Sequence, residues 1–558
     1  MRRVASGWTA LAAVVALAAC SATPPAGGGT QSKPTSPSVQ HADFLVFYAA
    51  GRHQQALKAV ERAGGTTVGE DPRLGYLLAD GGGRTFAEDL GTDPAIVGVS
   101  PDRAIGSTAA RRTGPAARRT GPAAFPDASA LLASRPGEPL AGLQWDMRMI
   151  GADRANAKVP GSRQVLVGVI DTGIDGKHPD IAANFDRELS RNFVTDKPKD
   201  DNGETLDGPC EAKDCKDPVD EDDDGHGTHV ASTIAAPING IGIAGVAPDV
   251  RLVNIRAGQD SGFFFLKPSL DALTYAADIG VDVANMSYFV DPWLFNCTNN
   301  KSDSRKQQLE QQAIITGMQR AIDYARGKGV TLVSALGNGA ADLGRPTVDD
   351  KSPGYPEGEQ KVRRVDNSCI NVPAESNGVI SVSSIGPSGR KAIYSDYGVE
   401  QTDLSAPGGD VLDGTGAKAT RSILGAAPER VLRAAGRIDA SGNPKGADVV
   451  RDCTRRPCAY YQYLDGTSMA APHATGVAAI LISRFGKPGA GGALSLAPAT
   501  VEDLLYKSAV QKPCPTPRQY VYKSYGQTDT HMCEGEQSRN GFYGRGMVDA
   551  WKAATFEP

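Results

Sequence analysis

Three residues whose side chains can together break an amide bond lie far apart in this chain of 558 residues. The first is Ser468, in the segment Asp-Gly-Thr-Ser-Met-Ala-Ala-Pro-His, where small residues after the serine favour the start of a helix. A serine hydroxyl becomes a good nucleophile when a neighbouring base accepts its proton. A helix that starts there also directs backbone N–H groups at developing negative charge. The segment therefore predicts a nucleophile that requires a base from elsewhere in the chain.

His226 and Asp171 are the candidate base and its partner. Asp171 follows the apolar run 165–170, and a carboxylate at the carboxyl end of a parallel strand lies where α/β sheets place active sites. Its Asp-Thr-Gly motif also occurs in aspartic proteases, which need two copies, whereas this chain has one. His226 is surrounded by small residues that let another element approach closely. His229 follows three residues later, so a metal-binding pair is the alternative, although such histidines on helices usually lie four apart with a glutamate between them.

Apolar strands that alternate with helical patterns predict an α/β fold from about residue 142 to residue 553. Continuously apolar strands are typical of a parallel sheet that helices cover on both faces. The expected strands are 165–170, 252–255, 281–285, 330–334 and 379–383, and the clearest helices are 270–278 and 314–326. The polar or irregular segments 291–311, 340–371 and 411–461 predict surface insertions.

Residues 1–20 have the features of an export signal. Arg2 and Arg3 precede a short apolar run, which ends Leu-Ala-Ala-Cys and resembles a bacterial lipobox. In that interpretation Cys20 is lipidated and anchors the protein to a membrane, and an ordinary secretory signal is the alternative. Residues 21–42 are rich in Ser, Thr, Pro and Gly and predict a flexible tether.

Residues 43–106 predict a small α+β domain, and residues 141–558 the large one. The small domain alternates between strand and helix at 44–48, 53–63, 74–78, 85–90 and 96–99. The linker between the domains, 107–140, contains Arg-Arg-Thr-Gly-Pro-Ala-Ala twice in succession. Two copies are too few for a solenoid, so we interpret the repeat as an exposed spacer whose arginines make it an easy target for proteases.

The cysteines and the charge favour an exported globular protein. Of nine cysteines, eight remain when Cys20 is set aside, and an even number in an exported chain predicts disulfides. Nearness in sequence favours Cys210–Cys215, Cys453–Cys458 and Cys514–Cys533, and leaves Cys297–Cys369, among about 105 formal pairings. Zinc is the alternative for the two short pairs, but their spacing is wide and no histidine cluster lies beside them. A net charge of −5 gives no reason to expect a nucleic-acid partner.

In chain order the three candidate catalytic residues are Asp171, His226 and Ser468, which is the order of the triad in subtilisin. Val-Ile-Asp-Thr-Gly-Ile-Asp at 169–175, His-Gly-Thr-His-Val-Ala at 226–231 and Gly-Thr-Ser-Met-Ala at 466–470 resemble the motifs of the subtilisin-like serine protease family. The resemblance covers about residues 140–553 and implies a doubly wound, mainly parallel sheet and a serine endopeptidase that needs no catalytic cofactor. It also implies that Ser468 attacks the peptide carbonyl, His226 accepts its proton and Asp171 orients His226.

The resemblance implies further residues around the triad. Family members use an asparagine side chain to bind the oxyanion, and Asn338 in Leu-Gly-Asn-Gly matches it. Substrates bind as an added strand; the residues implied to contact them are Ser287, Tyr288, Phe289, Leu336 and Gly337. The usual Ser-Leu-Gly-Gly stretch lacks its glycines here, so Tyr288 and Phe289 are expected to narrow the cleft or fill a side-chain pocket. His473, just after the nucleophile, is interpreted as a packing residue.

A structural calcium ion is also implied, because Pro-Ile-Asn-Gly-Ile-Gly-Ile at 237–243 resembles a calcium loop of the family. The implied ligands are the side chains of Asp180 and Asn239 and the carbonyls of Pro237, Ile241 and Ile243, a set of oxygens that suits this ion. Gln144 is an approximate match to one further ligand. A glycine-rich turn without an ion is the alternative. The acidic run 220–224 is expected to be a solvated loop, with a second ion as its alternative.

The small domain at 43–106 resembles the inhibitory propeptide of the family, a ferredoxin-like domain that occupies the cleft and is then cut off. The resemblance implies self-processing between about residues 106 and 141, with peptides, proteins and the chain's own propeptide as partners. Such a cut would separate the enzyme from Cys20, so we expect a bacterial surface lipoprotein, an extracellular enzyme after maturation, or both. A catalytically silent surface binding module and an esterase or transpeptidase with the same triad are the alternatives.

Overall fold

The computed structural model describes residues 42–81, 83, 85–102, 107–108, 138–356, 358–414, 418–488, 494–524 and 527–558. The predicted lipid site at Cys20, the tether up to residue 41 and the tandem repeat lie outside the described residues. Among the residues that are described, no helix has both the length and the apolar character that crossing a membrane requires.

Seven parallel strands form the central sheet, in the order β15-β14-β11-β9-β6-β8-β7. In chain order they are β6 (Leu166–Ile170), β7 (Arg191–Asn192), β8 (Arg251–Arg256), β9 (Val283–Met286), β11 (Thr331–Ala335), β14 (Val379–Ile385) and β15 (Leu404–Pro407). After β6, strands β7 and β8 are added on one side of it in the sheet. Strand β9 and the later strands are added on its other side, so the strand order reverses between β6 and β9. Open α/β sheets place their ligand crevice at such a reversal, outside the carboxyl ends of the strands.

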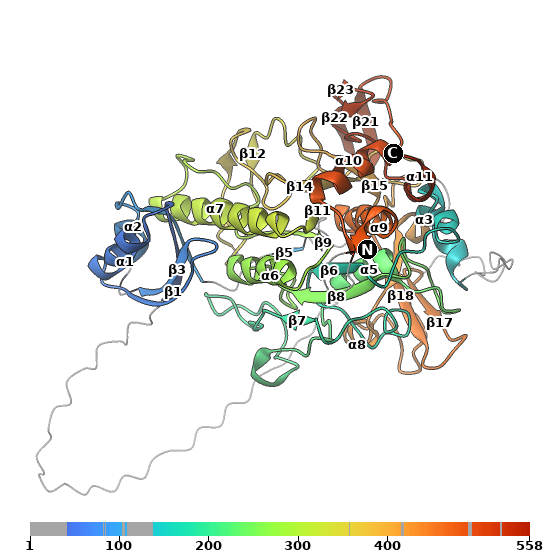
Figure 1. Ribbon diagram of the computed structural model, residues 1–558, viewed down its shortest axis with the longest axis horizontal. Helices are drawn as coiled ribbons and strands as arrows, with labels where there is room; N and C mark the ends of the chain where they lie inside the picture. The colour runs from blue at the N-terminus through green and yellow to red at the C-terminus, as the bar shows by residue number, and fades with distance from the viewer. Residues whose placement is uncertain are drawn as a thin grey trace, which may run out of the picture. The chain divides into compact units, whose positions relative to one another are not determined.

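Helices cover both faces of the sheet (Figure 1), which confirms the predicted doubly wound α/β fold. One face carries α5 (His226–Ala235), α9 (Thr467–Phe485), α10 (Pro498–Ser508), α11 (Ala550–Thr555) and the short helices α3 (Trp145–Met149) and α4 (Ala152–Ala155). The other face carries α6 (Leu266–Asp278) and α7 (Arg305–Gly327). Alternate residues of β6 face the two layers, because Val167 and Val169 lie in the first hydrophobic cluster and Leu166 and Ile170 in the second.

A small antiparallel sheet with two helices precedes the large domain. Its elements are β1 (Ala42–Tyr48), α1 (His53–Arg62), β2 (Thr66–Asp71), β3 (Tyr76–Gly81), α2 (Phe86–Leu90) and β4 (Ile96–Pro101). The strand order β2-β3-β1-β4 and the β-α-β-β-α-β succession are those of a ferredoxin-like fold. Strand β2 is missing from the sequence prediction because it pairs only with β3, is largely exposed, and contains polar residues and a glycine in place of an apolar pattern.

The small sheet packs against α7 of the large domain. Phe47 lies in one hydrophobic cluster with residues of α7. Gly317 provides the space for its ring, since a Cβ at residue 317 would lie 2.6 Å from Phe47 Cζ. Arg320 donates hydrogen bonds to the carbonyl oxygens of Tyr48 at 2.9 Å and Gly75 at 3.0 Å. Apolar packing and paired backbone carbonyls therefore join the two domains.

None of the three predicted surface insertions lies wholly on the surface. Residues 291–311 include the buried Trp293 and the first turns of α7, and residues 340–371 include the buried Tyr355 and Arg363. The third segment departs furthest from the prediction. Residues 411–461 contain β16 (Ile423–Ala426), α8 (Glu429–Ala434), β17 (Val449–Asp452) and the start of β18 (Ala459–Leu464), and these strands form an antiparallel sheet in the order β16-β18-β17. Ile423 and Tyr461 belong to the main hydrophobic cluster. The apolar segments are short and separated by long charged stretches, so they do not stand out in the sequence.

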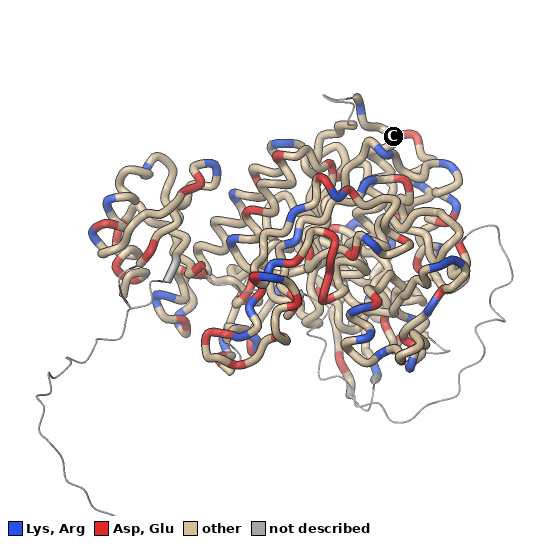
Figure 2. The backbone as a smooth tube through the Cα atoms, turned by 90° about the horizontal axis from the view of Figure 1, so that it is seen from below, with Lys and Arg blue, Asp and Glu red and all other residues tan. Residues whose placement is uncertain are grey.

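Short elements and disulfides complete the large domain. The structure contains the four disulfides expected from the sequence, Cys210–Cys215, Cys297–Cys369, Cys453–Cys458 and Cys514–Cys533. The short antiparallel pairs are β5 (Ser107–Thr108) with β10 (Tyr288–Phe289), β12 (Val348–Asp349) with β13 (Arg363–Arg364), β19 (Lys487–Pro488) with β20 (Leu494–Ser495), β21 (Gln519–Ser524) with β22 (Gln527–Met532), and β23 (Gly535–Glu536) with β24 (Arg539–Asn540). Basic and acidic residues are interspersed along the described chain in Figure 2, which favours no polyanionic partner.

The packing of Phe47 against Gly317 predicts that Gly317→Ala loosens the contact between the domains. The added methyl group has no room beside a buried ring, and overpacking of this kind typically costs about 1–3 kcal/mol. We expect faster hydrogen exchange at the backbone amides of β1 and β4. The matched control is Gly327→Ala at the C-terminal end of the same helix, where a Cβ would meet nothing within 4 Å. Equal exchange rates in the two variants would contradict the predicted role of Gly317.

Candidate active site

Asp171 and His226 meet at the reversal point of the sheet. Asp171 follows β6 directly, and His226 is the first residue of α5. The ring Nδ1 of His226 donates a hydrogen bond of 2.7 Å to Asp171 Oδ1. Both side chains are buried, and within the described part of the chain His226 Nε2 has no hydrogen-bond partner. Because Nδ1 carries the proton that Asp171 accepts, Nε2 is the nitrogen that can accept another.

The charge of Asp171 dominates the electrostatics of His226. Burial by itself would lower the pKa of the imidazole, because it disfavours the charged ring. The Asp171 carboxylate more than offsets this, so the pKa of His226 is raised above its ordinary value. The pair can therefore stabilise an imidazolium ion inside the protein, which is what a base must become during proton transfer.

Asp222 holds the two segments of this pair together, and the sequence prediction missed it. Its Oδ1 accepts hydrogen bonds from the Thr172 hydroxyl at 3.1 Å and the Gly225 N–H at 2.9 Å. Its Oδ2 accepts from the N–H and hydroxyl of Thr228 at 2.9 and 2.6 Å. One buried carboxylate thus ties the turn after β6 to the first turn of α5. An acidic residue shortly before a predicted helix start is the sequence signal that could have identified it.

The prediction of a solvated loop for the acidic run 220–224 is wrong for its buried members. Asp220 and Asp222 are almost completely buried. Asp220 forms ion pairs with Lys177, at 3.3 Å, and with Arg187. A carboxylate can be buried when charged or polar groups pair with it, so this run is part of the framework around His226.

Ser468 is the second residue of α9 and forms a reciprocal contact with Ser287, which follows β9. The Ser468 hydroxyl donates to the Ser287 carbonyl at 3.2 Å, and the Ser287 hydroxyl donates to the Ser468 carbonyl at 3.1 Å. The second bond compensates for a missing backbone donor. Pro472 lies four residues after Ser468 and lacks the N–H that would bond to the Ser468 carbonyl in a regular helix. The Ser287 hydroxyl takes the place of that donor.

Asn338 lies after β11, and Thr467 fixes its orientation. The amide oxygen of Asn338 accepts hydrogen bonds from the backbone N–H and the hydroxyl of Thr467, both at 2.9 Å. Thr467 Oγ1 in turn accepts from the Gly337 N–H at 3.1 Å. Because the oxygen faces Thr467, the NH2 group points elsewhere, and a Cβ at residue 466 would lie 3.5 Å from it. The amide group is thus held as a donor next to the residue pair that precedes Ser468.

Asn338, Ser287 and Asp171 follow the neighbouring strands β11, β9 and β6, so they lie at the carboxyl ends of these strands. Helices α5 and α9 begin at the same end of the sheet. Of the predicted substrate contacts, Tyr288 and Leu336 have buried side chains in hydrophobic clusters. The Tyr288 ring stacks on Phe264 with centroids 4.1 Å apart. Tyr288 and Phe289 can therefore pair with an added strand through their backbone N–H and carbonyl groups.

Such an added strand is present in the structure. Strand β5 pairs with β10 in antiparallel register, with Thr108 opposite Tyr288 and Ser107 opposite Phe289. Addition of an extended segment to a sheet edge is a common mode of peptide recognition. The described segment that follows the small domain therefore lies along the edge that leads to Ser287.

The residues predicted to hold calcium lie together. Asp180 Oδ1 accepts from the Asn239 amide at 3.1 Å, and Oδ2 accepts from the Ile243 N–H at 3.0 Å and the Tyr461 hydroxyl at 2.9 Å. Burial, with Glu138 nearby, raises the pKa of Asp180 to about 8. Within the described residues Asp180 forms no ion pair with a basic side chain. Asp180 is thus a buried carboxylate that three donors contact and no cationic side chain of the described chain neutralises, and a calcium ion could supply the missing positive charge.

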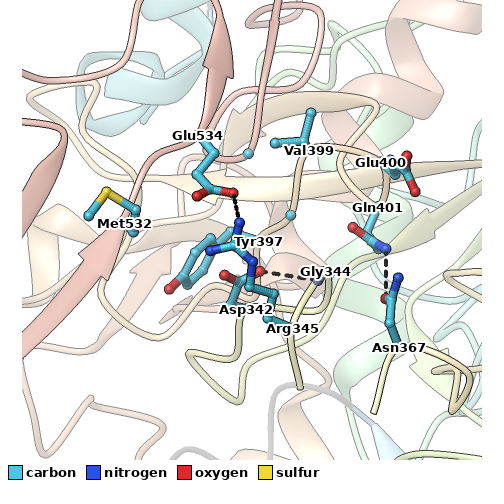
Figure 3. Close-up of a pocket in the computed structure, with 12 residues that line it drawn as sticks. Asp342, Gly344, Arg345, Asn367, Tyr397, Val399, Glu400, Gln401, Met532 and Glu534 are labelled. Carbon is cyan, nitrogen blue, oxygen red and sulfur yellow. Dashed lines mark hydrogen bonds and ion pairs between the residues drawn. The ribbon is translucent and has the colours of Figure 1, made fainter. Parts of the chain in front are cut away.

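A separate hollow of about 260 Å³ lies beside the end of β22. Figure 3 shows Arg345 and Glu534 paired on its wall, 2.7 Å apart, and Gln401 bonded to Asn367 at 3.5 Å. None of Asp171, His226 and Ser468 lines it. Since the one basic residue that lines it in the described chain, Arg345, already pairs with Glu534, we assign it no chemistry.

Comparison with known proteins agrees with this geometry. The model of the subtilase family matches residues 162–546. A thermophilic serine proteinase of Bacillus sp. (strain AK1) is 27% identical over 344 residues, which cover 62% of this chain and 58% of that protein. Subtilisin DY of Bacillus licheniformis is 26% identical over 341 residues, 61% of this chain and 85% of that protein. The epidermin leader peptide-processing serine protease EpiP of Staphylococcus epidermidis is 25% identical over 414 residues, 73% of each chain.

Solved structures share the fold. The crystal structure of EpiP from Staphylococcus aureus has a TM-score of 0.59 at 21% identity and covers 92% of this chain and 98% of its own. Fervidolysin from Fervidobacterium pennivorans has a TM-score of 0.53 at 21% identity and covers 93% of this chain and 61% of its own. The family match spans well over half of the chain and includes Asp171, His226 and Ser468, so the chain belongs to the subtilase family, whose members named above are serine proteases.

Proposed function

We propose that the chain is a serine endopeptidase that hydrolyses peptide bonds with Asp171, His226 and Ser468. The observation that carries this proposal is the 2.7 Å hydrogen bond from His226 Nδ1 to Asp171 Oδ1. This bond selects the tautomer in which Nε2 accepts a proton. Serine is a weak nucleophile without such a base, and the buried, oriented pair meets that requirement.

In the proposed reaction, the Ser468 hydroxyl turns from the Ser287 carbonyl to the substrate. Its oxygen bonds to the peptide carbonyl carbon while its proton moves to His226 Nε2. The Asn338 amide and the Ser468 N–H stabilise the oxyanion that forms. His226 then gives the proton to the leaving amine as the C–N bond breaks. Water attacks the acyl-enzyme in the same way, releases the new carboxyl group and restores Ser468.

In this proposal the ferredoxin-like domain is an inhibitory propeptide, and the segment after it is the first substrate. The pairing of β5 with β10 supports this role, because Thr108 lies opposite Tyr288, the residue that directly follows Ser287. The Ser287 carbonyl is the group to which the Ser468 hydroxyl donates. We therefore expect the chain to cut itself just after Thr108.

The export signal and Cys20 complete the proposal, with the precursor delivered outside the cytoplasmic membrane as a lipoprotein. A cut after Thr108 breaks the covalent connection to Cys20. The cleaved propeptide can still hold the enzyme through the contacts of Phe47 and Arg320 with α7. The enzyme is thus surface-bound while the domains stay together and extracellular once they separate.

We also propose that Asp180, Asn239 and the carbonyls of Pro237, Ile241 and Ile243 bind a structural calcium ion. When bound, the ion neutralises the buried Asp180 carboxylate and fixes the loop after α5. Catalysis itself needs no cofactor in this proposal.

Active-site labelling tests the endopeptidase. We expect a fluorophosphonate to form one adduct, on Ser468, and Ser468→Ala to abolish both the adduct and peptide hydrolysis. Asn338→Ala should lower kcat about 100- to 1,000-fold, because one oxyanion donor is lost. Asn202→Ala, at an exposed loop position, is the matched control and should leave kcat unchanged. A mature protein without the adduct would be a silent binding module, and one that cleaves esters but no peptides would be an esterase.

N-terminal sequencing tests self-processing. The mature wild-type enzyme is expected to begin shortly after Thr108, because Thr108 pairs with Tyr288, the neighbour of Ser287. The Ser468→Ala variant should retain residues 42–108 in covalent connection with the large domain. Processing of this variant at the same site during purification alone would assign the cut to another protease and refute self-processing.

Removal of calcium tests the metal site. A ligand that binds only the folded state at about 100 times its Kd adds about 2.7 kcal/mol of stability, so EDTA should lower the melting temperature of the wild type by several degrees. Asp180→Asn should melt at the lower temperature with or without added calcium. Melting curves of the wild type that are unaffected by EDTA and by calcium would leave Asp180 as part of an ion-free turn.

A further inference from the structure

A buried histidine–aspartate pair connects the helix that carries Ser468 to the start of the large domain. His473 is on α9, and Asp146 is on the short helix α3 near the start of the large domain. His473 Nε2 is 3.1 Å from Asp146 Oδ2, and the side chains are 0% and 1% exposed. The sequence predicted His473 as a packing residue. Its environment is polar on both nitrogens, which packing alone does not require.

The second nitrogen of His473 contacts the active-site turn. Nδ1 lies 2.8 Å from the carbonyl oxygen of Met469, the residue after Ser468. A carbonyl can only accept, so Nδ1 carries a proton. Nε2 faces the Asp146 carboxylate, and the two contacts together fix the ring in one orientation. Asp146 therefore fixes the position of His473, and His473 in turn donates to the Met469 carbonyl.

The first turn of α9 depends on such side-chain bonds. Pro472 removes the backbone donor for the Ser468 carbonyl, and the Ser287 hydroxyl replaces it at 3.1 Å. The Met469 carbonyl accepts a hydrogen bond from the His473 imidazole at 2.8 Å. The position of the Ser468 hydroxyl and N–H is thus fixed between Ser287 and His473, and not by regular helix bonds alone.

The segment that carries Asp146 is itself firmly attached. The Gln144 side chain exchanges two hydrogen bonds with the backbone of Ala244, at 2.9 and 3.1 Å. The Trp145 indole donates to the Ser422 carbonyl at 3.1 Å. These bonds keep Asp146 in place after any cut in the linker. The segment lies outside residues 162–546, the part of the chain that the family model matches.

We propose that Asp146 is a positioning residue for the nucleophile, acting through His473 on the turn that carries Ser468. The role rests on the proposed protease function. Asp146 touches neither substrate nor reacting atoms, so its loss should change how often Ser468 is in the attacking geometry while substrate binding stays the same.

The test compares Asp146→Asn with wild type and with the control Asp153→Asn, an exposed aspartate on the next helix. In Asp146→Asn, we expect kcat and the rate of fluorophosphonate labelling of Ser468 to fall about 10- to 100-fold, with KM changed less than twofold. Asp153→Asn should match wild type in all three. If Asp146→Asn does not mature, His473→Asn provides the same test. Its amide can still donate to the Met469 carbonyl, while the contact with Asp146 is lost.

The double variant should be no slower than the slower single variant, since the two residues act as one unit.

The outcomes separate this role from the proposed function. Labelling and kcat within twofold of wild type in both variants, at any melting temperature, would overturn the positioning role. A fall in melting temperature with unchanged kcat at lower temperature would assign the pair to stability alone and overturn it as well. A wild-type protein that neither labels nor cleaves peptides would overturn the protease function, and the positioning role with it.

Discussion

Helix α9 is buried on every side, and this single constraint organises the active site. From Thr467 to Ile482 each of its residues is buried. A helix of this kind must supply a partner for each polar group it carries, because an unpaired buried polar group costs about 1–3 kcal/mol. The partners come from separate segments of the chain, and the meeting of those segments at the N-terminus of α9 creates the site.

The hydrogen bonds around this helix form one connected set. Thr475 donates to the Asn285 side chain at 3.0 Å, and Asn285 donates to the Ser287 hydroxyl at 2.8 Å. Ser287 then bonds to the Ser468 carbonyl. Thr467 at the start of the helix orients Asn338. The residues that satisfy the polar groups of the buried helix therefore also hold Ser468, the proposed nucleophile, and Asn338, the proposed oxyanion donor.

The sequence predicts those features of the fold and the candidate site that depend on residues close together in the chain. The strands of the central sheet are continuous apolar runs, and the motifs around Asp171, His226 and Ser468 have short, specific spacings. Long-range partners were not predictable. Asp222 and Asp146 resemble ordinary surface aspartates until the fold brings Thr228 and His473 against them. Strand β2 and the sheet β16-β18-β17 were missed for a related reason, since pairing with distant strands, and not a local apolar pattern, gives them their structure. Helix α7 begins at Arg305, ahead of its apolar pattern, because Ser304 and Gln307 cap it reciprocally.

The two-residue pairing of β5 with β10 is too short to hold a peptide by itself, and its strength comes from covalent attachment to the domain docked on α7. A tethered segment meets the substrate strand at an effective concentration in the millimolar range, whatever the concentration of the protein. In the proposed maturation, a cut there would leave that advantage to the docked domain alone, and dilution of the sample would favour its dissociation. If the proposed self-processing occurs, the rate at which the small domain dissociates from α7 would set the delay between the first cut and an open cleft.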